Sequence, residues 1–135
     1  NVECEDNAFL ILKSENDIVA TLHSSATQWK HKFLLEMAFE DGYINLDGIL
    51  STTRSYAPES MIIGKREFED VTFAMGKPAE SITYYEYDKS WELELKEFVD
   101  AVNGKNVINN GTSNDALEIM NLTDFIYSNS TVEYK

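Results

Sequence analysis

The chain has 135 residues, of which 43% are hydrophobic and 26% charged, a length that suits a single domain. Its formal net charge of −13 argues against nucleic acid and anionic lipid as partners, because both are bound through excess Lys and Arg. The longest uncharged apolar run, residues 8–12, is too short to cross a bilayer, so we expect no membrane partner. The lone cysteine, Cys4, cannot form an internal disulfide, and we expect a cytoplasmic protein.

Two strands are predicted at the start of the chain. Residues 8–12 form a continuous apolar run, and residues 18–29 extend as a second strand rich in β-branched and small residues. A polar turn at residues 15–17 separates them. The strand pattern begins within a few residues of Asn1, which is not a methionine, and we therefore expect the chain to be a piece of a longer protein.

A β-hairpin is predicted over residues 33–47. Apolar residues alternate strictly over residues 33–40, which is the period of a half-buried strand. Asp41-Gly42 is a residue pair that a two-residue hairpin turn prefers. A turn at this pair places apolar residues opposite apolar ones, but it also sets Glu36 opposite Asp47, a like-charge pair that costs stability.

Further strands are predicted at residues 61–65, 71–75 and 81–87, and two helices follow them. Strands in one run followed by helices indicate an α+β fold: a mainly antiparallel, open-faced β-sheet with two C-terminal helices packed on one face. Several strands carry apolar or aromatic residues on both faces. The second face therefore needs a cover, which is either another domain or a second copy of the chain.

Both helices carry start and stop signals. The first is capped by Asp88 or Ser90 and ends at Gly104, since glycine readily takes the left-handed conformation that closes a helix. The second is capped by Thr112 or Ser113. Each has an apolar stripe at helical spacing, which we expect to be buried against the sheet. The stripe of the first helix consists of Trp91, Leu95, Phe98, Val99 and Val102.

Motifs for catalysis or cofactor binding are not found in the sequence. The six glycines never form a dinucleotide or P-loop fingerprint, and the two histidines and one cysteine lack the spacing of zinc ligands. His23 beside Ser24 does not make a nucleophile and base, because adjacent side chains of a strand point to opposite faces. We expect no catalytic, cofactor or metal site within this chain.

The corner after the second predicted strand is the one candidate binding site. Residues 29–32, Trp-Lys-His-Lys, form the only basic cluster of the acidic chain, and they follow small polar residues that suit a polyol pocket. Two interpretations remain open: a solvated corner with the tryptophan anchored in the core, or a wall of a ligand pocket. Strand alternation would put Gln28 on the face opposite its neighbours. The candidate substrate-side residues are Ser25, Thr27, Gln28, Trp29, Lys30 and His31.

A resemblance to a known family is carried by the run CEDNAFLILKSENDIVATLHSSATQWKHKFLLEMAFEDGYINLDG. This run resembles the C-terminal domain of the glucose–fructose oxidoreductase / inositol dehydrogenase (Gfo/Idh/MocA) family of NAD(P)-dependent dehydrogenases, with an acidic pair, a Ser…Thr-Gln-Trp strand and a GxIxLDG hairpin. Residues 91–128 are similar to the closing helices of that family, with their G-x-x-x-DAL…IY-S pattern. The resemblance covers essentially the whole chain.

The resemblance implies that residues 1–135 are one C-terminal domain, and that the nucleotide fingerprint and catalytic lysine lie in an N-terminal Rossmann domain absent from this chain. The parent enzyme would use NAD or NADP to oxidise or reduce a sugar, cyclitol or related polyol. This fragment would be inactive alone, bind no cofactor, wall the substrate pocket and form a homodimer through the open sheet face. Residues 76–78, Gly-Lys-Pro, lack the glutamate of the family's lysine motif and are interpreted as a turn. The alternative is a stand-alone binding or dimerisation module.

Overall fold

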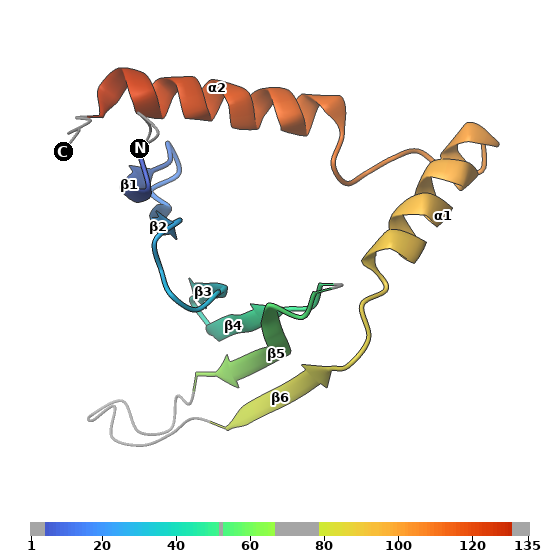
Figure 1. The fold of residues 1–135 in the computed structure, drawn as a ribbon, viewed down its shortest axis with the longest axis horizontal. Coiled ribbons are helices and arrows are strands. Elements are labelled where there is room, and N and C mark those ends of the chain that lie inside the picture. Colours follow the sequence, from blue (N-terminus) through green and yellow to red (C-terminus); the bar gives the residue numbers. More distant parts are fainter. Residues whose placement is uncertain (1–4, 52, 67–78, 131–135) are drawn as a thin grey trace. The chain divides into compact units, whose positions relative to one another are not determined.

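The computed structural model describes residues 5–51, 53–66 and 79–130 (Figure 1). Within these ranges, antiparallel strands precede two helices, so the α+β class with C-terminal helices is confirmed. The predicted strand at 71–75 and turn at 76–78 lie outside the described residues. The elements are β1 Asn7–Lys13, β2 Val19–Ser25, β3 Leu34–Phe39, β4 Gly42–Ile49, β5 Tyr56–Lys65, β6 Glu80–Tyr85, α1 Ser90–Val102 and α2 Ser113–Asn129.

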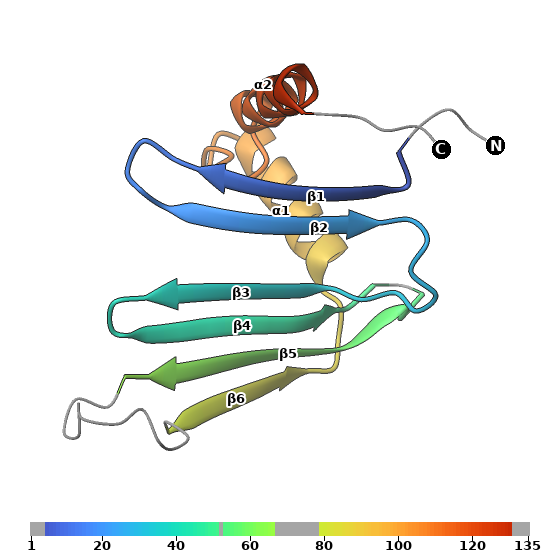
Figure 2. The same cartoon turned by 90° about the vertical axis from the view of Figure 1, so that its left-hand side faces the viewer.

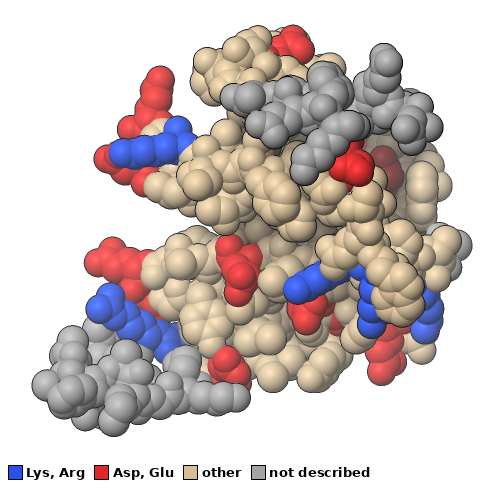
Figure 3. Space-filling model, turned by 60° about the vertical axis from the view of Figure 1, so that its left-hand side comes forward, with Lys and Arg blue, Asp and Glu red and all other residues tan. Residues whose placement is uncertain are grey.

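The chain divides into two compact units. The first unit joins Asn1–Trp29 to Leu95–Lys135 and holds β1, β2, α2 and most of α1. The second unit, Lys30–Glu94, holds β3 to β6. Neither helix, as far as the described residues extend, is long and apolar enough to cross a membrane. On the face drawn in Figure 3, Asp and Glu side chains are scattered among uncharged ones.

In the first unit, β1 and β2 form a two-stranded antiparallel sheet in which Phe9 pairs with His23. The two rings stack with their centroids 4.2 Å apart and their planes 9° from parallel. The predicted turn at residues 15–17 is confirmed: the backbone N–H of Ser14 donates to the carbonyl of Ile18 over 2.9 Å, and Asp17 has a φ of 62°.

Strand β2 ends at Ser25, four residues before the predicted end. The backbone N–H of Thr27 donates to the Ser25 hydroxyl over 3.2 Å. Such a side-chain bond offers the backbone an alternative to the strand ladder, which explains why the extended pattern stops here. The corner from Ala26 to Trp29 is therefore bent, and strand alternation does not govern it.

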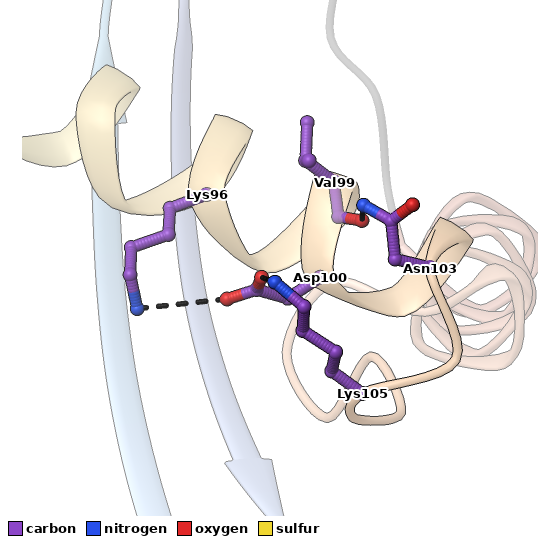
Figure 4. Close-up of polar contacts among 5 residues, drawn as sticks. All are labelled: Lys96, Val99, Asp100, Asn103 and Lys105. Carbon is purple, nitrogen blue, oxygen red and sulfur yellow. Dashed lines mark hydrogen bonds and ion pairs between the residues drawn. The ribbon is translucent and has the colours of Figure 1, made fainter.

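The helix ends follow the sequence signals closely. At the end of α1, Gly104 has a φ of +69°, its N–H donates to the Ala101 carbonyl over 2.9 Å, and the next N–H, of Lys105, donates to the Asp100 carbonyl over 2.9 Å. This pair of bonds is a Schellman motif. Lys105 and Lys96 also place their ammonium groups 3.2 and 3.6 Å from the Asp100 carboxylate (Figure 4). Gly104 is therefore the helix stop that its position predicts.

Helix α2 begins with a reciprocal capping box. Thr112 is the N-cap, and its hydroxyl accepts a 3.2 Å bond from the N–H of Asp115. The Asp115 carboxylate accepts 2.8 Å bonds from both the N–H and the hydroxyl of Thr112, and these bonds lower the pKa of Asp115. Near the other end of α2, the Tyr127 hydroxyl donates to the carboxylate of Glu5, just before β1.

The apolar stripe of α1 does not have the burial that its spacing predicts. Trp91 is 68% exposed and Phe98 is 56% exposed, and no residue described in either helix is buried. The same holds beyond the helices, since no described hydrophobic side chain in either unit is buried. Among the described elements, only neighbouring strands contact one another, so no sheet covers the apolar face of either helix.

In the second unit, the strands lie in the order β3-β4-β5-β6, all antiparallel (Figure 2). The predicted hairpin is present, but its turn is Glu40-Asp41 and its register differs by two residues from the prediction. Glu36 consequently faces Asn45, and the predicted clash with Asp47 does not form. A shift of two residues keeps each side chain on its predicted face.

The register shift is explained by Gly42, which opens β4 instead of completing the turn. Its φ is +154°, and a Cβ at this position would lie 2.1 Å from the carbonyl oxygen of Gly64 on β5. Glycine is therefore needed for the close approach of two backbones. The ring of Tyr43, in turn, covers Gly64, and its hydroxyl donates to the Glu80 carboxylate of β6 over 2.5 Å. This bond raises the pKa of Tyr43, and desolvation and the charge of Glu80 act in the same direction.

Strand β5 begins at Tyr56, well before the predicted start at residue 61. The sequence did not predict its N-terminal part, because Pro58 is unusual inside a strand; this proline follows a cis peptide bond. The register of β4 and β5 shifts between Asp47 and Ile49, and Pro58 lies on the partner strand at this irregularity. Bulges are the places in a sheet that tolerate proline, which is why the strand continues through this residue.

Candidate functional site

The predicted corner begins with a cluster of small polar side chains in the first unit. The hydroxyls of Ser25 and Thr27 lie 3.3 Å apart. The side-chain amide of Asn7, at the start of β1, donates to the Thr27 hydroxyl over 3.0 Å. The backbone N–H of Ala26 donates to the carbonyl of Asp6 over 2.7 Å, which holds the bend against the segment that leads into β1. Ser25 and Thr27 are thus brought together as predicted, although not by a strand.

Asn7 belongs to this cluster and was missed by sequence reasoning. The signal was available in the turn at residues 15–17, because a tight turn there sets the pairing of the strands on either side. That pairing puts Asn7 directly opposite Ser25. The neighbouring carboxylate of Asp6 accepts a 3.0 Å bond from the same Asn7 amide. The cluster therefore combines hydroxyl, amide and carboxylate groups.

Gln28 and Trp29 lie in the bent segment, outside any strand. The prediction that alternation sets Gln28 opposite its neighbours is wrong for this reason. Trp29 is 95% exposed, so the interpretation that it anchors the corner in the core of this chain is also wrong.

Lys30 and His31 belong to the second unit. The imidazole ring of His31 lies against the ring of Tyr56, at the start of β5, with centroids 4.9 Å apart and planes tilted by 47°. Lys30 forms no ion pair with any residue that the structure describes. The six predicted residues thus fall into two separately described groups, with the boundary between Trp29 and Lys30.

The chemistry available at the corner is recognition. Hydroxyl and amide groups that already bond to one another can exchange these bonds for bonds to the hydroxyls of a polyol. Within the described part of the chain, the Ser25 hydroxyl bonds to the Thr27 hydroxyl and backbone N–H, and not to an imidazole that could act as a base. Across residues 5–51, 53–66 and 79–130, no group of three or more His, Cys, Asp or Glu side chains is placed to hold a metal ion.

The corner thus presents hydroxyl and amide groups that bond to one another, followed by an exposed tryptophan. Comparison of the chain with models of known protein families, with curated proteins and with solved structures found no significant match.

Proposed function

We propose that this chain is the C-terminal domain of an NAD(P)-dependent oxidoreductase of the Gfo/Idh/MocA family, whose parent enzyme acts on a sugar, cyclitol or related polyol. In this proposal an N-terminal Rossmann domain supplies the cofactor site and the catalytic groups. The chain itself contributes a wall of the substrate pocket and the homodimer interface, and it has no activity alone. We further propose that the protein is located in the cytoplasm.

The observation that carries the proposal is the uncovered apolar surface of both units. A domain that folds as a complete monomer buries most of its large apolar side chains. Here Phe98 and Trp91 of α1, and Trp29 at the corner, are all more than half exposed. A second domain and a second copy of the chain would supply the missing cover. Such surface supports a proposal in which the chain packs against a second domain or a second copy.

The GxIxLDG motif adds support, because its two glycines, Gly42 and Gly48, have structural tasks. A Cβ on Gly42 would lie 2.1 Å from the Gly64 carbonyl oxygen, and one on Gly48 would lie 1.7 Å from the carbonyl oxygen of Pro58. The sheet therefore requires both glycines of the motif on which the resemblance rests. Asp115, the aspartate of the DAL pattern, closes the capping box of α2.

Kinetics of the full-length parent test the role of the corner. We expect Gln28→Ala and Lys30→Ala to raise KM or lower kcat/KM for the polyol, with little change in Tm, because both side chains lie outside the strands. Lys13→Ala, on β1, is a matched control, since its ammonium group bonds 2.7 Å away to Asp17 at the far turn of the same hairpin. Kinetics identical to the parent for both corner variants would exclude the pocket-wall role.

Two measurements on the isolated chain test the other parts. Calorimetric titration with NAD(H) and NADP(H) should show no binding, because the chain lacks the glycine-rich fingerprint that holds a pyrophosphate. Micromolar affinity for either cofactor would contradict this. Light scattering should report a dimer at high concentration, and a monomer there would count against the dimer interface.

The exposed apolar surface also fits a second candidate, a stand-alone binding or dimerisation module. The coding sequence upstream of Asn1 separates the two. An open reading frame that continues into a Rossmann domain supports the oxidoreductase, and an initiator methionine directly before Asn1 supports the module.

A further inference from the structure

A concave pocket lies in the second unit, between the loop after β4 and the segment after β6. It is a hollow widely open to solvent, with a volume of about 470 Å³, and small-molecule sites occupy roughly 300–1,000 Å³. The lining combines apolar side chains, two tyrosines and one charge of each sign. The lining residues are Leu50, Arg54, Ala57, Pro58, Tyr85, Glu86 and Tyr87.

Hydrogen bonds hold the loop that forms one wall of this pocket. The backbone N–H of Leu50 donates to the carboxylate of Glu59 on β5 over 2.5 Å. The hydroxyls of Ser51, Thr53 and Ser55 form a chain, with oxygen separations of 3.2 and 2.8 Å. A loop tied in this way presents its side chains in a defined position, which lowers the entropic cost of binding a ligand.

Arg54 stands out in this loop. Its φ is +54°, a left-handed conformation that is unfavourable for a side chain with a Cβ. The conformation is kept by two backbone bonds: the N–H of Arg54 donates to the Ser51 carbonyl over 2.9 Å, and its carbonyl accepts a 3.2 Å bond from Ala57. Residues held in such conformations cluster at ligand-binding sites. The backbone that carries a long cationic side chain is thus held where a glycine would be easier to accommodate.

The guanidinium group of Arg54 has no acidic partner among the residues that the structure describes, although the chain carries a net charge of −13. Glu86 lines the same pocket and forms no ion pair with Arg54 within the same described part of the chain. A planar guanidinium group matches a carboxylate in two parallel hydrogen bonds. The Glu86 carboxylate repels a second negative charge and accepts bonds from hydroxyl groups.

We propose that this pocket binds a small hydroxylated carboxylate of the sugar-acid class. Its carboxylate group bonds to Arg54, a hydroxyl donates to Glu86, and its apolar face lies on the rings of Tyr85 and Tyr87. None of the residues that line the pocket is among the predicted corner residues Ser25 to His31. The pocket needs neither cofactor nor Rossmann domain, so its test does not bear on the proposed oxidoreductase.

The test is a two-dimensional NMR titration of the 135-residue chain with D-glucuronate, and with D-glucose as the neutral counterpart. We expect glucuronate to shift the amide signals of residues 50, 54 and 85–87. Glucose should bind at least about tenfold more weakly than glucuronate, because it lacks the carboxylate that forms a charge-assisted bond to Arg54. Equal affinity for both sugars, or no binding of glucuronate, would overturn the proposal.

Variants assign the binding to Arg54. Arg54→Gln should weaken glucuronate binding about tenfold or more. Arg54→Gly removes the same group and suits a positive φ, so its fold should persist while binding is lost. Arg66→Gln is the matched control, because the ten-residue strand β5 separates it from Arg54, and its guanidinium donates to the Glu40 carbonyl over 3.4 Å. Full binding by Arg54→Gly, or equal loss in Arg66→Gln, would contradict the assignment.

Discussion

Replacing Gly48 by Ala should destabilise the second unit, and the structure allows us to estimate the loss in free energy of unfolding. Gly48 is buried and has a φ of +78°, which costs a residue with a Cβ about 1–2 kcal/mol. The new Cβ would lie 1.7 Å from the carbonyl oxygen of Pro58 and 2.6 Å from that of Tyr56. Both are backbone atoms, so relief requires moving β5, and overpacking of this kind costs about 1–3 kcal/mol more. We expect a total loss of about 2–5 kcal/mol.

Gly104→Ala is the matched control for this substitution. Gly104 has a similar φ of +69°, but a Cβ there would meet no atom within 4 Å. It should therefore cost only the conformational term of about 1–2 kcal/mol. Urea unfolding of both variants, followed by circular dichroism, measures the two losses. A difference below about 1 kcal/mol between them would refute the claim that the close approach of β4 and β5 makes Gly48 necessary.

Three further predictions follow from single contacts. The bonds from Thr112 lower the pKa of Asp115. The stability that the capping box contributes is therefore present above the ordinary value of 3.8 and is lost as the pH falls through the lower folded-state pKa. In an acid titration, the helix signal of Thr112→Ala should fall at a higher pH than that of the parent. The bond to Glu80 is the main reason why the pKa of Tyr43 is raised above 10.0. The stability that this bond contributes is therefore present below pH 10.0 and is lost as the pH rises through the folded-state pKa. Spectrophotometric titration of Glu80→Gln should show a Tyr43 pKa closer to 10.0, and an unchanged pKa would exclude the bond as the cause. Phe98→Ala should cost about 1–2 kcal/mol in urea unfolding of this chain, because less than half of the ring is covered and full burial is worth about 3–5 kcal/mol; a loss in the full-burial range would show that the ring is covered in solution.

Local chemistry was readable from the sequence wherever neighbouring residues decide the structure. Gly104 was identified as a helix stop, and Thr112 as one of two possible caps, because a cap is formed by residues within one turn of the helix. The polar turn at residues 15–17 and the faces of the β3–β4 hairpin followed from the same kind of short-range pattern. The α+β class followed from the order of these elements along the chain.

The candidate corner was predicted in part. Its role in binding stays a prediction, and the structure shows only that Ser25 and Thr27 lie together. The third member, Asn7, comes from the neighbouring strand, and only the pairing of β1 with β2 brings it there. Trp29 was expected to reach a core, but burial depends on what the rest of the fold places over a residue, and here it is exposed.

Tertiary structure alone decided the features that depend on contact between distant segments. The pair Asp41-Gly42 predicted that Gly42 lies in the turn. In the structure, Gly42 opens β4 and is required to be a glycine by the close approach of Gly64 on β5. The turn is therefore shifted by one residue, to Glu40-Asp41. Arg54 and Tyr85 likewise line one pocket although the loop and the strand that carry them are distant in sequence. A sequence pattern reports the preferences of adjacent residues, whereas close approach and pocket formation depend on which backbones pair across the sheet.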